Sequence, residues 1–264
     1  MSAHIDQRAA VSAKAQLGNG VVVSPFAVIE DDVVVGEGTW IGPHVVLFNG
    51  ARIGRECKIF PGASIGAPPQ DLKFKGELTT LEVGDRTVIR EYVTLNRGTS
   101  ESGKTVIGSD CLFMAYTHVA HDCIVGNHAI LANCVALAGH VTMGEYAIIG
   151  GLTPVHQFVS IGEHAMIGGG LRAVKDVPPY VLAGQEPLCF EKLNSVGLQR
   201  RGFSEKTIGL LDQVYRLVYR SNLNVSQAAE RIKSEIELVP EVQKVLDFIG
   251  KSKRGLIPGH SRHR

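Results

Sequence analysis

The stretch HVAHDC, residues 118–123, places two histidines three residues apart, with an aspartate directly after the second. An imidazole whose second nitrogen is held by a neighbouring carboxylate can act as a general base. Histidines are also common zinc ligands, so the same residues could belong to a metal site. The stretch alone does not decide between these chemistries, because the direction of each side chain depends on the element that carries it.

A six-residue repeat dominates the first two thirds of the chain. From Ile5 to Ile167 every sixth position is apolar at 25 of 28 places, and glycine often follows, as at Gly18 and Gly126. A period of six is neither helical nor the simple alternation of a half-buried strand. It favours a short strand and a tight bend, repeated, with the apolar residue pointing inward.

Three such faces, each one hexad long, would close a triangular coil, and strands of successive coils would pair in parallel. The pattern resembles the left-handed hexapeptide β-helix. We therefore expect a mainly β fold, with a left-handed parallel β-helix over residues 1–180.

The repeat stops after Ile167, and DVPPYVLAG, residues 176–184, is typical of a connector. Apolar residues at helical spacing then predict a small α-helical C-terminal domain over residues 181–264. The expected helix starts are near Ser204, Ser226 and Pro240.

The register of the coil gathers several histidines on one edge. Residues three hexads apart lie one above the other, so we expect Gly139 directly over His121, where its backbone N–H could stabilise a developing oxyanion. All the converging side chains are predicted at outward or corner positions. The residues predicted to meet on this edge are His118, His121, Asp122, His140 and His156.

Three carboxylates break the repeat, namely Asp71, Glu77 and Glu101. Asp71 and Glu77 would point inward, and a buried carboxylate without a partner is prohibitive. Residues 68–78, PPQDLKFKGEL, must therefore leave the coil as a projecting loop. That loop is either a tolerated insertion or a cover that closes over a ligand with Gln70, Asp71 and Lys73.

Charge is uneven along the chain. Residues 181–264 carry 14 basic and 9 acidic groups, a net +5, whereas residues 1–180 carry 13 and 17, a net −4. An acidic ligand or partner would favour the C-terminal part. Its adjacent Arg200 and Arg201 are either solvated helix charges or a clamp for a diphosphate.

The whole chain of 264 residues has a net charge of +1, which gives no electrostatic signal for nucleic acid. Its first residues lack a signal-peptide pattern, and no apolar run approaches the length of about 18 residues that a membrane helix needs. We expect a cytoplasmic protein without stable membrane insertion. Five cysteines with no CxxC pair are consistent with reduced thiols.

Seven segments occur in a characteristic order, and they are QDLKFKGE, NRGT, HVAHDC, LAGHV, IIGGLTPVHQF, DVPPYV and RRGFS. This set spans essentially the whole chain and resembles the UDP-N-acetylglucosamine 3-O-acyltransferase family of lipid A biosynthesis. The resemblance implies a homotrimer with active sites between subunits and with no metal or cofactor. It also implies transfer of a 3-hydroxyacyl chain from acyl carrier protein to the 3-hydroxyl of UDP-N-acetylglucosamine, the first step of lipid A biosynthesis.

The resemblance further assigns roles to residues. It implies that His121 is the general base, that Asp122 orients it, and that Gly139 supplies the oxyanion N–H. The residues implied to bind the substrates are Gln70, Asp71, Lys73, His118, His140, His156, Gln157, Asn194, Arg200 and Arg201.

A column without large side chains is predicted on a different edge. Asn133, Gly151 and Gly169 follow one another at intervals of three hexads, whereas His121 and Gly169 are eight hexads apart, which is not a whole number of coils. In a trimer this column could face a neighbour's His121 edge and form a groove for an extended acyl chain. In the resembling family the position of Gly169 measures the hydrocarbon chain, and glycine there permits a long one.

Other functions are distinguishable. Asn96 and Val196 stand where some members of the family have histidine and glutamate, so transfer to a 3-amino analogue of the sugar nucleotide is an alternative. A γ-class carbonic anhydrase shares the coil and would bind zinc, but it leaves the helical tail without a role. The related N-acyltransferase carries a domain before its β-helix, whereas hexads here start at Ile5.

Overall fold

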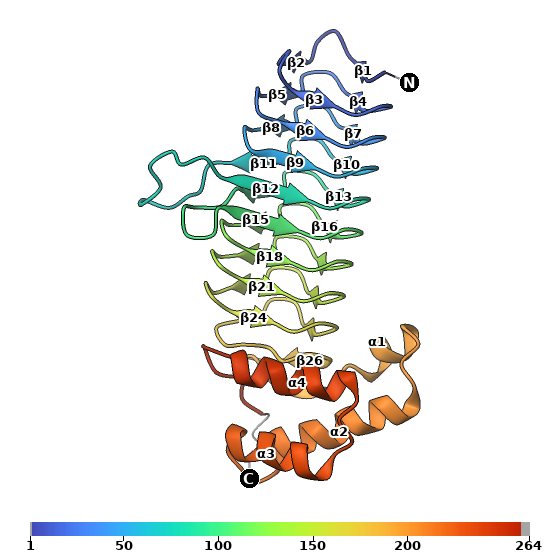
Figure 1. Ribbon diagram of the computed structural model, residues 1–264, viewed down its shortest axis with the longest axis vertical. Coiled ribbons are helices and arrows are strands. Elements are labelled where there is room, and N and C mark those ends of the chain that lie inside the picture. The colour runs from blue at the N-terminus through green and yellow to red at the C-terminus, as the bar shows by residue number, and fades with distance from the viewer. Residues whose placement is uncertain (1, 260–264) are drawn as a thin grey trace.

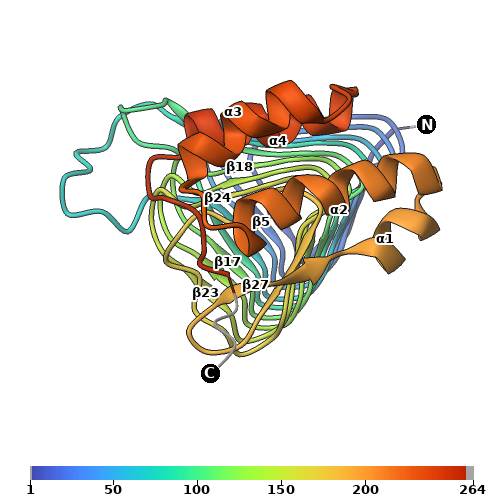
Figure 2. The same ribbon diagram turned by 90° about the horizontal axis from the view of Figure 1, so that it is seen from below.

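Short parallel strands, about one for each hexad, wind into a three-sided prism in the computed structural model, which describes residues 2–259 (Figure 1). Seen along its axis, the coil is triangular, and the helices lie at its C-terminal end (Figure 2). Each side of the prism is one sheet, and within the coil its strands run parallel. One coil consists of three hexads, because His4 pairs with Val22 and Val22 with Trp40.

We call the three sheets A, B and C. Sheet A contains β1 (His4–Ile5), β4 (Val22–Val23), β7 (Trp40–Ile41), β10 (Lys58–Ile59), β13 (Val88–Ile89), β16 (Leu112–Phe113), β19 (Ile130–Leu131), β22 (Ile148–Ile149), β25 (Met166–Ile167), β26 (Val181–Gly184) and β27 (Cys189–Leu193). Sheet B contains β2 (Ala10–Val11), β5 (Val28–Ile29), β8 (Val46–Leu47), β11 (Ser64–Ala67), β14 (Thr94–Asn96), β17 (His118–Val119), β20 (Ala136–Leu137) and β23 (Pro154–Val155). Sheet C contains β3 (Gln16–Leu17), β6 (Val34–Val35), β9 (Ala51–Ile53), β12 (Thr80–Val83), β15 (Lys104–Ile107), β18 (Ile124–Val125), β21 (Thr142–Met143) and β24 (Ser160–Ile161).

The apolar residue of each hexad points into the prism, as the repeat predicts. From Val23 to Ile167 these side chains are buried along the whole axis, and together they form one continuous core. Burial of each large aliphatic side chain stabilises the fold by about 1.5–3 kcal/mol. At most of the bends between strands one residue adopts a left-handed conformation, for example Asp122 with φ 59° and His140 with φ 61°.

Two insertions interrupt the register of three hexads per coil, and both lie at the corner between sheets B and C, the BC corner. Lys58 pairs with Val88, five hexads further on, so the loop between β11 and β12 adds the length of two hexads. Thr94 pairs with His118, four hexads further on, so the loop between β14 and β15 adds the length of one. The prediction of a projecting loop at 68–78 is confirmed, and Glu101 lies in a second loop, which was not predicted.

The repeat also continues further than expected. Val177 bridges Ile161, and β26 pairs in parallel with β25, so the stretch 176–184 adds a last partial coil where we expected a connector. β27 then pairs with β26 in antiparallel orientation and leads into the helices. The division of the chain at residue 180 stays a prediction.

Within residues 2–259, four helices cap the C-terminal end of the prism, and they are α1 (Ser195–Arg200), α2 (Glu205–Arg220), α3 (Val225–Glu235) and α4 (Pro240–Lys251). Ser204 caps α2 and Pro240 opens α4, as predicted. α3 begins at Val225, one residue before the predicted Ser226, because Asn224 and Gln227 form a capping box. No helix in the described part of the chain is long and apolar enough to cross a membrane.

Candidate active site

Both insertions project from the BC corner (Figure 1). Residues of both loops line a cavity of about 650 Å³ against this corner. The predicted edge residues His121 and His140 meet the predicted loop residues Gln70, Asp71 and Lys73 in this cavity. Gln157 lies in its wall as well. Its complete lining is Gln70, Asp71, Leu72, Lys73, Phe74, Glu77, Thr99, Ser100, Glu101, His121, His140, Gln157 and Phe158.

Asn96 anchors the larger loop from inside the molecule. It is 2% exposed, and its side-chain amide donates to the carbonyls of Ala67 at 3.3 Å and Pro68 at 3.1 Å. The next residue, Arg97, donates to the Asn49 carbonyl at 2.8 Å and places its guanidinium carbon 5.5 Å from the Phe74 ring centroid. Asn96 therefore bonds to the chain at the base of the loop and is absent from the cavity lining.

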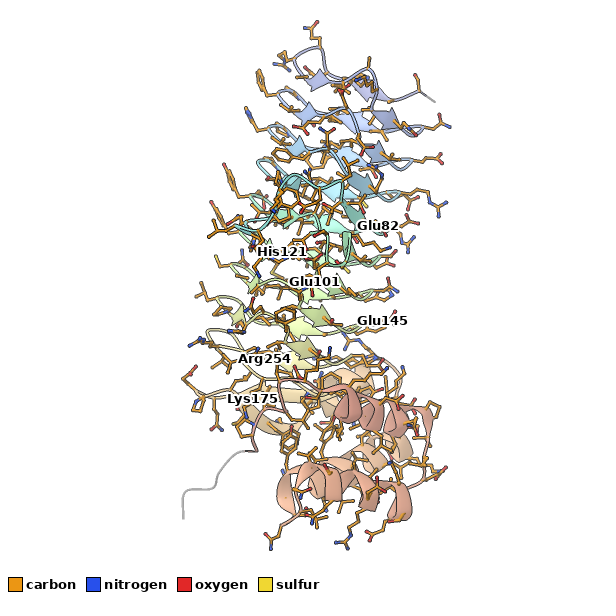
Figure 3. All side chains as sticks on the ribbon, turned by 60° about the vertical axis from the view of Figure 1, so that its left-hand side comes forward. Glu82, Glu101, His121, Glu145, Lys175 and Arg254 are labelled. Carbon is orange, nitrogen blue, oxygen red and sulfur yellow. The ribbon has the colours of Figure 1, made fainter. Side chains whose placement is uncertain are left out.

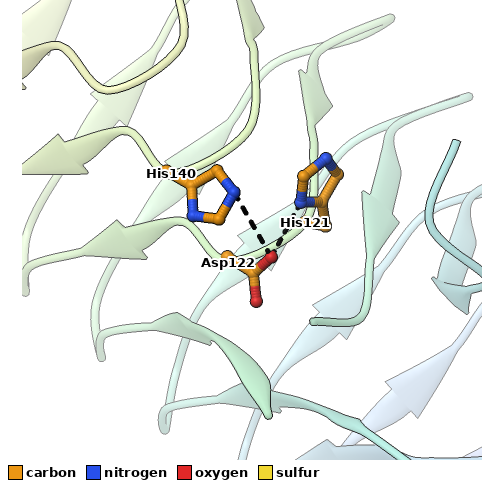
Figure 4. Close-up of side chains that lie close together, drawn as sticks. All are labelled: His121, Asp122 and His140. Atoms are coloured by element: carbon orange, nitrogen blue, oxygen red, sulfur yellow. Dashed lines mark hydrogen bonds and ion pairs between the residues drawn. The ribbon is translucent and has the colours of Figure 1, made fainter. Parts of the chain in front are cut away.

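At the centre of the site, His121 and Asp122 form a close pair (Figure 4). The His121 Nδ1 lies 2.8 Å from the Asp122 Oδ2. The Asp122 side chain has no exposure to solvent, whereas the His121 side chain keeps 15%. Figure 3 shows His121 beside Glu101, on the side of the prism where the loops project.

Asp122 accepts further hydrogen bonds, from residues that the hexad repeat does not predict to lie near it. The Thr99 N–H donates to Oδ1 at 2.9 Å, the Thr99 hydroxyl donates to Oδ2 at 2.7 Å, and the Ser102 hydroxyl donates to Oδ1. Burial raises the pKa of Asp122, but hydrogen bonds from Ser102, Thr99 and His121 outweigh it and lower the pKa to about 2. The only trace of these partners in the sequence is Glu101, which breaks the repeat beside them.

These contacts determine what His121 can do. A carboxylate that stays ionised at neutral pH accepts hydrogen bonds only, so the proton between the pair sits on the His121 Nδ1. In the neutral imidazole the Nε2 then carries a free lone pair. Because His121 lines the cavity, that nitrogen can take a proton from a bound substrate.

Gly139 lies against the His121 ring, as the register of three hexads per coil predicts. A Cβ at this position would come within 2.6 Å of the His121 Cε1 and 2.8 Å of its Nε2, so only glycine leaves the ring in place. Within residues 2–259, the Gly139 N–H donates to no carbonyl or side chain. It is therefore free to bind an oxygen next to the base.

His140 completes the cavity wall. Its ring meets the His121 ring edge-on with centroids 5.1 Å apart, and it stacks on Phe158 at 4.5 Å. Its Nε2 lies 3.5 Å from the Glu101 carboxylate and 3.7 Å from the Asp122 Oδ2. Glu101 thus faces the cavity next to His140.

The described residues include one cluster of metal-type ligands, and it coincides with this site. Ligand atoms of His121, Asp122 and His140 all lie within 4.8 Å of one another. A zinc ion that used the His121 Nδ1 as a ligand would have to displace the hydrogen bond between that nitrogen and Asp122. Both carboxylate oxygens also accept bonds from Thr99 and Ser102. The arrangement favours an acid–base pair over a metal site.

Two predicted histidines do not line the cavity. His118 has its Nδ1 2.7 Å from the Thr94 hydroxyl, and burial lowers its pKa. His156 has its Nδ1 3.1 Å from the Gln157 carbonyl. They lie on the same edge as His121, in the neighbouring positions that the hexad phase predicts, but outside the enclosed space.

Asn194, Arg200 and Arg201 are not near His121 within one chain. Asn194 is 8% exposed, donates to the His164 carbonyl at 3.0 Å and accepts from the Gly197 N–H as the cap of α1. The Arg201 guanidinium carbon lies 5.0 Å from the Tyr146 ring centroid. Tyr146 and His164 belong to the corner between sheets C and A, so these residues stand at a different edge of the prism.

The glycine column stands at the third corner, between sheets A and B. A Cβ on Gly151 would come within 3.0 Å of the Asn133 carbonyl oxygen, and one on Gly169 within 3.0 Å of the Gly151 carbonyl oxygen. The three residues are therefore stacked on successive coils, as predicted. Leu152, beside them, is 69% exposed.

Comparison with known proteins places the chain among acyltransferases. Residues 176–257 match the family described as UDP-N-acetylglucosamine O-acyltransferase, domain 2, and residues 14–49 and 104–139 match the bacterial transferase hexapeptide family. Acyl-(acyl-carrier-protein)–UDP-N-acetylglucosamine O-acyltransferases from Thermodesulfovibrio yellowstonii and Pseudomonas entomophila are 44% and 45% identical over 253 residues. Each of these alignments covers 96% of this chain and 98% of the relative.

Solved structures agree. The UDP-N-acetylglucosamine acyltransferase of Bacteroides fragilis is 43% identical to this chain and superposes with a TM-score of 0.94. The superposition covers 96% of this chain and 99% of that structure. That of Francisella novicida is 36% identical with a TM-score of 0.94, at 96% coverage of this chain and 94% of its own. The similarity confirms the left-handed parallel β-helix with a small helical C-terminal part. This chain belongs to the family of acyl-(acyl-carrier-protein)–UDP-N-acetylglucosamine O-acyltransferases.

Proposed function

We propose that the chain transfers a 3-hydroxyacyl group from acyl carrier protein to the 3-hydroxyl of UDP-N-acetylglucosamine, with His121 as the general base. The observation that supports this role is the hydrogen bond from the His121 Nδ1 to a buried, ionised Asp122, with Gly139 against the same ring. Such a pair leaves the Nε2 basic and aimed at a ligand in the cavity.

The reaction follows from this geometry. The His121 Nε2 takes the proton of the sugar hydroxyl while its oxygen attacks the thioester carbonyl of the donor. The negative charge that develops on the carbonyl oxygen is stabilised by the Gly139 N–H. When the C–S bond breaks, the protonated His121 returns its proton to the departing sulfur, so the base is regenerated and an ester is formed.

The substrates would be held by groups from more than one edge. Gln70, Asp71, Lys73, His140 and Gln157 line the cavity and would contact the sugar or the donor. His118 and His156 flank it on the same edge. Asn194, Arg200 and Arg201 would bind the nucleotide or its phosphates from a second copy of the chain, because their own edge lies elsewhere.

A homotrimer would bring the three edges together. Leu72 and Leu78 on the projecting loop are fully exposed in one chain, which favours packing of this loop against another copy. Light scattering tests the assembly, and a monomer with full activity would refute a shared site.

The decisive test of the base is His121→Ala. We expect acyl transfer to fall by about 10²-fold or more, since a positioned general base is lost, while the fold stays intact. His44→Ala is a control, because His44 also lies at a bend of the coil but stacks on Phe26 at another corner. Turnover near that of the wild type in His121→Ala would end the assignment.

The acyl-transfer assay also tests which atom of the sugar nucleotide accepts the acyl group and whether the reaction needs a metal ion. With UDP-N-acetylglucosamine the product is an ester, which hydroxylamine cleaves, whereas a 3-amino analogue would give a resistant amide. Treatment with a chelator should leave the rate unchanged. A loss of activity that zinc restores would favour a metal enzyme of the carbonic anhydrase kind.

A further inference from the structure

We propose that Thr99 and Ser102, on the short loop between β14 and β15, are positioning residues for acyl transfer, because they hold the Asp122 carboxylate in the orientation that fixes His121. This inference rests on the proposed role of His121 as the base. It assigns a task to the inserted hexad at the BC corner, which otherwise only interrupts the coil.

Thr99 donates hydrogen bonds to both carboxylate oxygens of Asp122. Its backbone N–H donates to Oδ1 at 2.9 Å and its hydroxyl donates to Oδ2 at 2.7 Å. The hydroxyl oxygen accepts the Glu101 N–H at 3.2 Å. Because that contact occupies the acceptor side of the hydroxyl, its single proton is directed toward Asp122.

Ser102 adds a third donor from the far side of the same loop. Its hydroxyl lies close to the Asp122 Oδ1 and 2.9 Å from the Lys104 carbonyl, and its single proton goes to the ionised carboxylate because that is the stronger acceptor. The Gly103 N–H donates to the Thr99 carbonyl at 2.8 Å, which closes the loop on itself. The loop is tight where it starts and ends, since a Cβ on Gly98 would lie 2.3 Å from the Lys104 nitrogen. Thr99 and Ser102 are therefore presented by a constrained turn.

The consequence is a carboxylate with no freedom to rotate. With three donors from the loop and one from His121, both oxygens are occupied, and the side chain is completely buried. The titratable groups that face it are His121 and His140, with Glu101 next to His140. Holding Asp122 in place holds the His121 tautomer and the direction of its ring.

The test compares Thr99→Val, Ser102→Ala and Thr99→Ser in the full-length protein. Thr99→Val keeps the shape and the backbone donor but removes the hydroxyl, and Thr99→Ser restores it. We expect Thr99→Val and Ser102→Ala to lower kcat by about tenfold or more with little change in KM, since a base misplaced by a fraction of an ångström loses rate rather than affinity. Thr99→Ser should recover most of the rate.

Thr87→Val is the matched control. Thr87 is a buried threonine whose hydroxyl donates to the Gly108 carbonyl at 2.9 Å and accepts the Cys111 N–H at 3.3 Å, away from the cavity. Loss of the Thr87 hydroxyl should lower the thermal stability of the protein and leave kcat unchanged. A second readout needs no activity, because fewer donors raise the pKa of Asp122, and acid unfolding of Thr99→Val should then begin at a higher pH than in the wild type.

Each outcome decides the matter. A wild-type kcat in folded Thr99→Val, or a reduced kcat that Thr99→Ser does not recover, overturns the positioning role. An unchanged acid-unfolding profile shows that these hydroxyls do not hold the carboxylate. Wild-type activity in His121→Ala would instead refute the proposed base. The acid-unfolding comparison would still test whether Thr99 and Ser102 hold the Asp122 carboxylate by hydrogen bonds.

Discussion

Replacing Asp122 with asparagine keeps the shape of the side chain and removes its charge. In the wild type both carboxylate oxygens accept, Oδ1 from the Thr99 N–H and the Ser102 hydroxyl, and Oδ2 from the Thr99 hydroxyl and the His121 Nδ1. An amide has one oxygen and one NH₂ group. Hydroxyl protons can turn away from the NH₂ group, but the Thr99 N–H is fixed by the backbone.

The amide oxygen must therefore face the Thr99 N–H, and the NH₂ group faces His121. The His121 Nδ1 then has to accept, which moves its proton to the Nε2. That tautomer presents an N–H to the substrate and cannot take a proton. We expect Asp122→Asn to lower kcat by about 10²- to 10⁴-fold, the range for loss of a general base.

The same substitution changes stability in a defined pH window. The pKa of Asp122 is lowered from 3.8 to about 2, so ionisation stabilises the folded state fully above pH 4, and this contribution is lost as the pH falls toward 2. Allowing for screening by solvent in the open cavity, it amounts to about 1–2 kcal/mol. In Asp122→Asn the free energy of unfolding should depend less on pH between 4 and 2.

Asp110→Asn serves as the control. Asp110 occupies the same kind of left-handed bend, with φ 58°, but pairs with Arg86 at 2.7 Å on the surface. This variant should retain full activity. Measurement of kcat for both variants with a saturating donor decides the point, and our reasoning about the tautomer is wrong if Asp122→Asn turns over at the rate of Asp110→Asn.

Three further predictions concern other positions. Gly139→Ala should reduce kcat by about 10²-fold in steady-state assays, because the new Cβ would lie 2.6 Å from the His121 Cε1 and displace the ring. Gly169→Met should shift relative kcat/KM from long toward shorter 3-hydroxyacyl donors, and an unchanged profile would show that the chain does not follow the column of Asn133, Gly151 and Gly169. Burial lowers the pKa of His164 from 6.5 to about 4, so below pH 6.5 the unfolded chain takes up a proton that the folded chain does not, and the folded state loses roughly 2 kcal/mol by pH 4. Denaturant unfolding at fixed protein concentration should show this loss in the wild type, whereas His164→Phe, which can still stack on Tyr146, should lack it.

The sequence by itself determined the coil, its period and the direction of most side chains. A hexad is a local signal that recurs without change along the axis, so counting in steps of three hexads was sufficient to stack Gly139 over His121 and Gly169 over Gly151. It also located the larger insertion, since a carboxylate at an inward phase cannot stay in the coil. The two broken hexads at Asp71 and Glu77 correspond to the two hexads of length that the first loop adds.

Only the tertiary structure decided what the insertions do, because a loop that leaves the repeat also leaves its register. The hexad phase placed Asp122 at an outward corner, but Thr99 and Ser102, 23 and 20 residues away in sequence, cover it completely and keep it ionised. The same limit applies to Asn96, which the fold turns inward to hold the larger loop. Periodicity predicts the direction of a side chain within the coil, whereas burial and charge state depend on which distant segment folds over it.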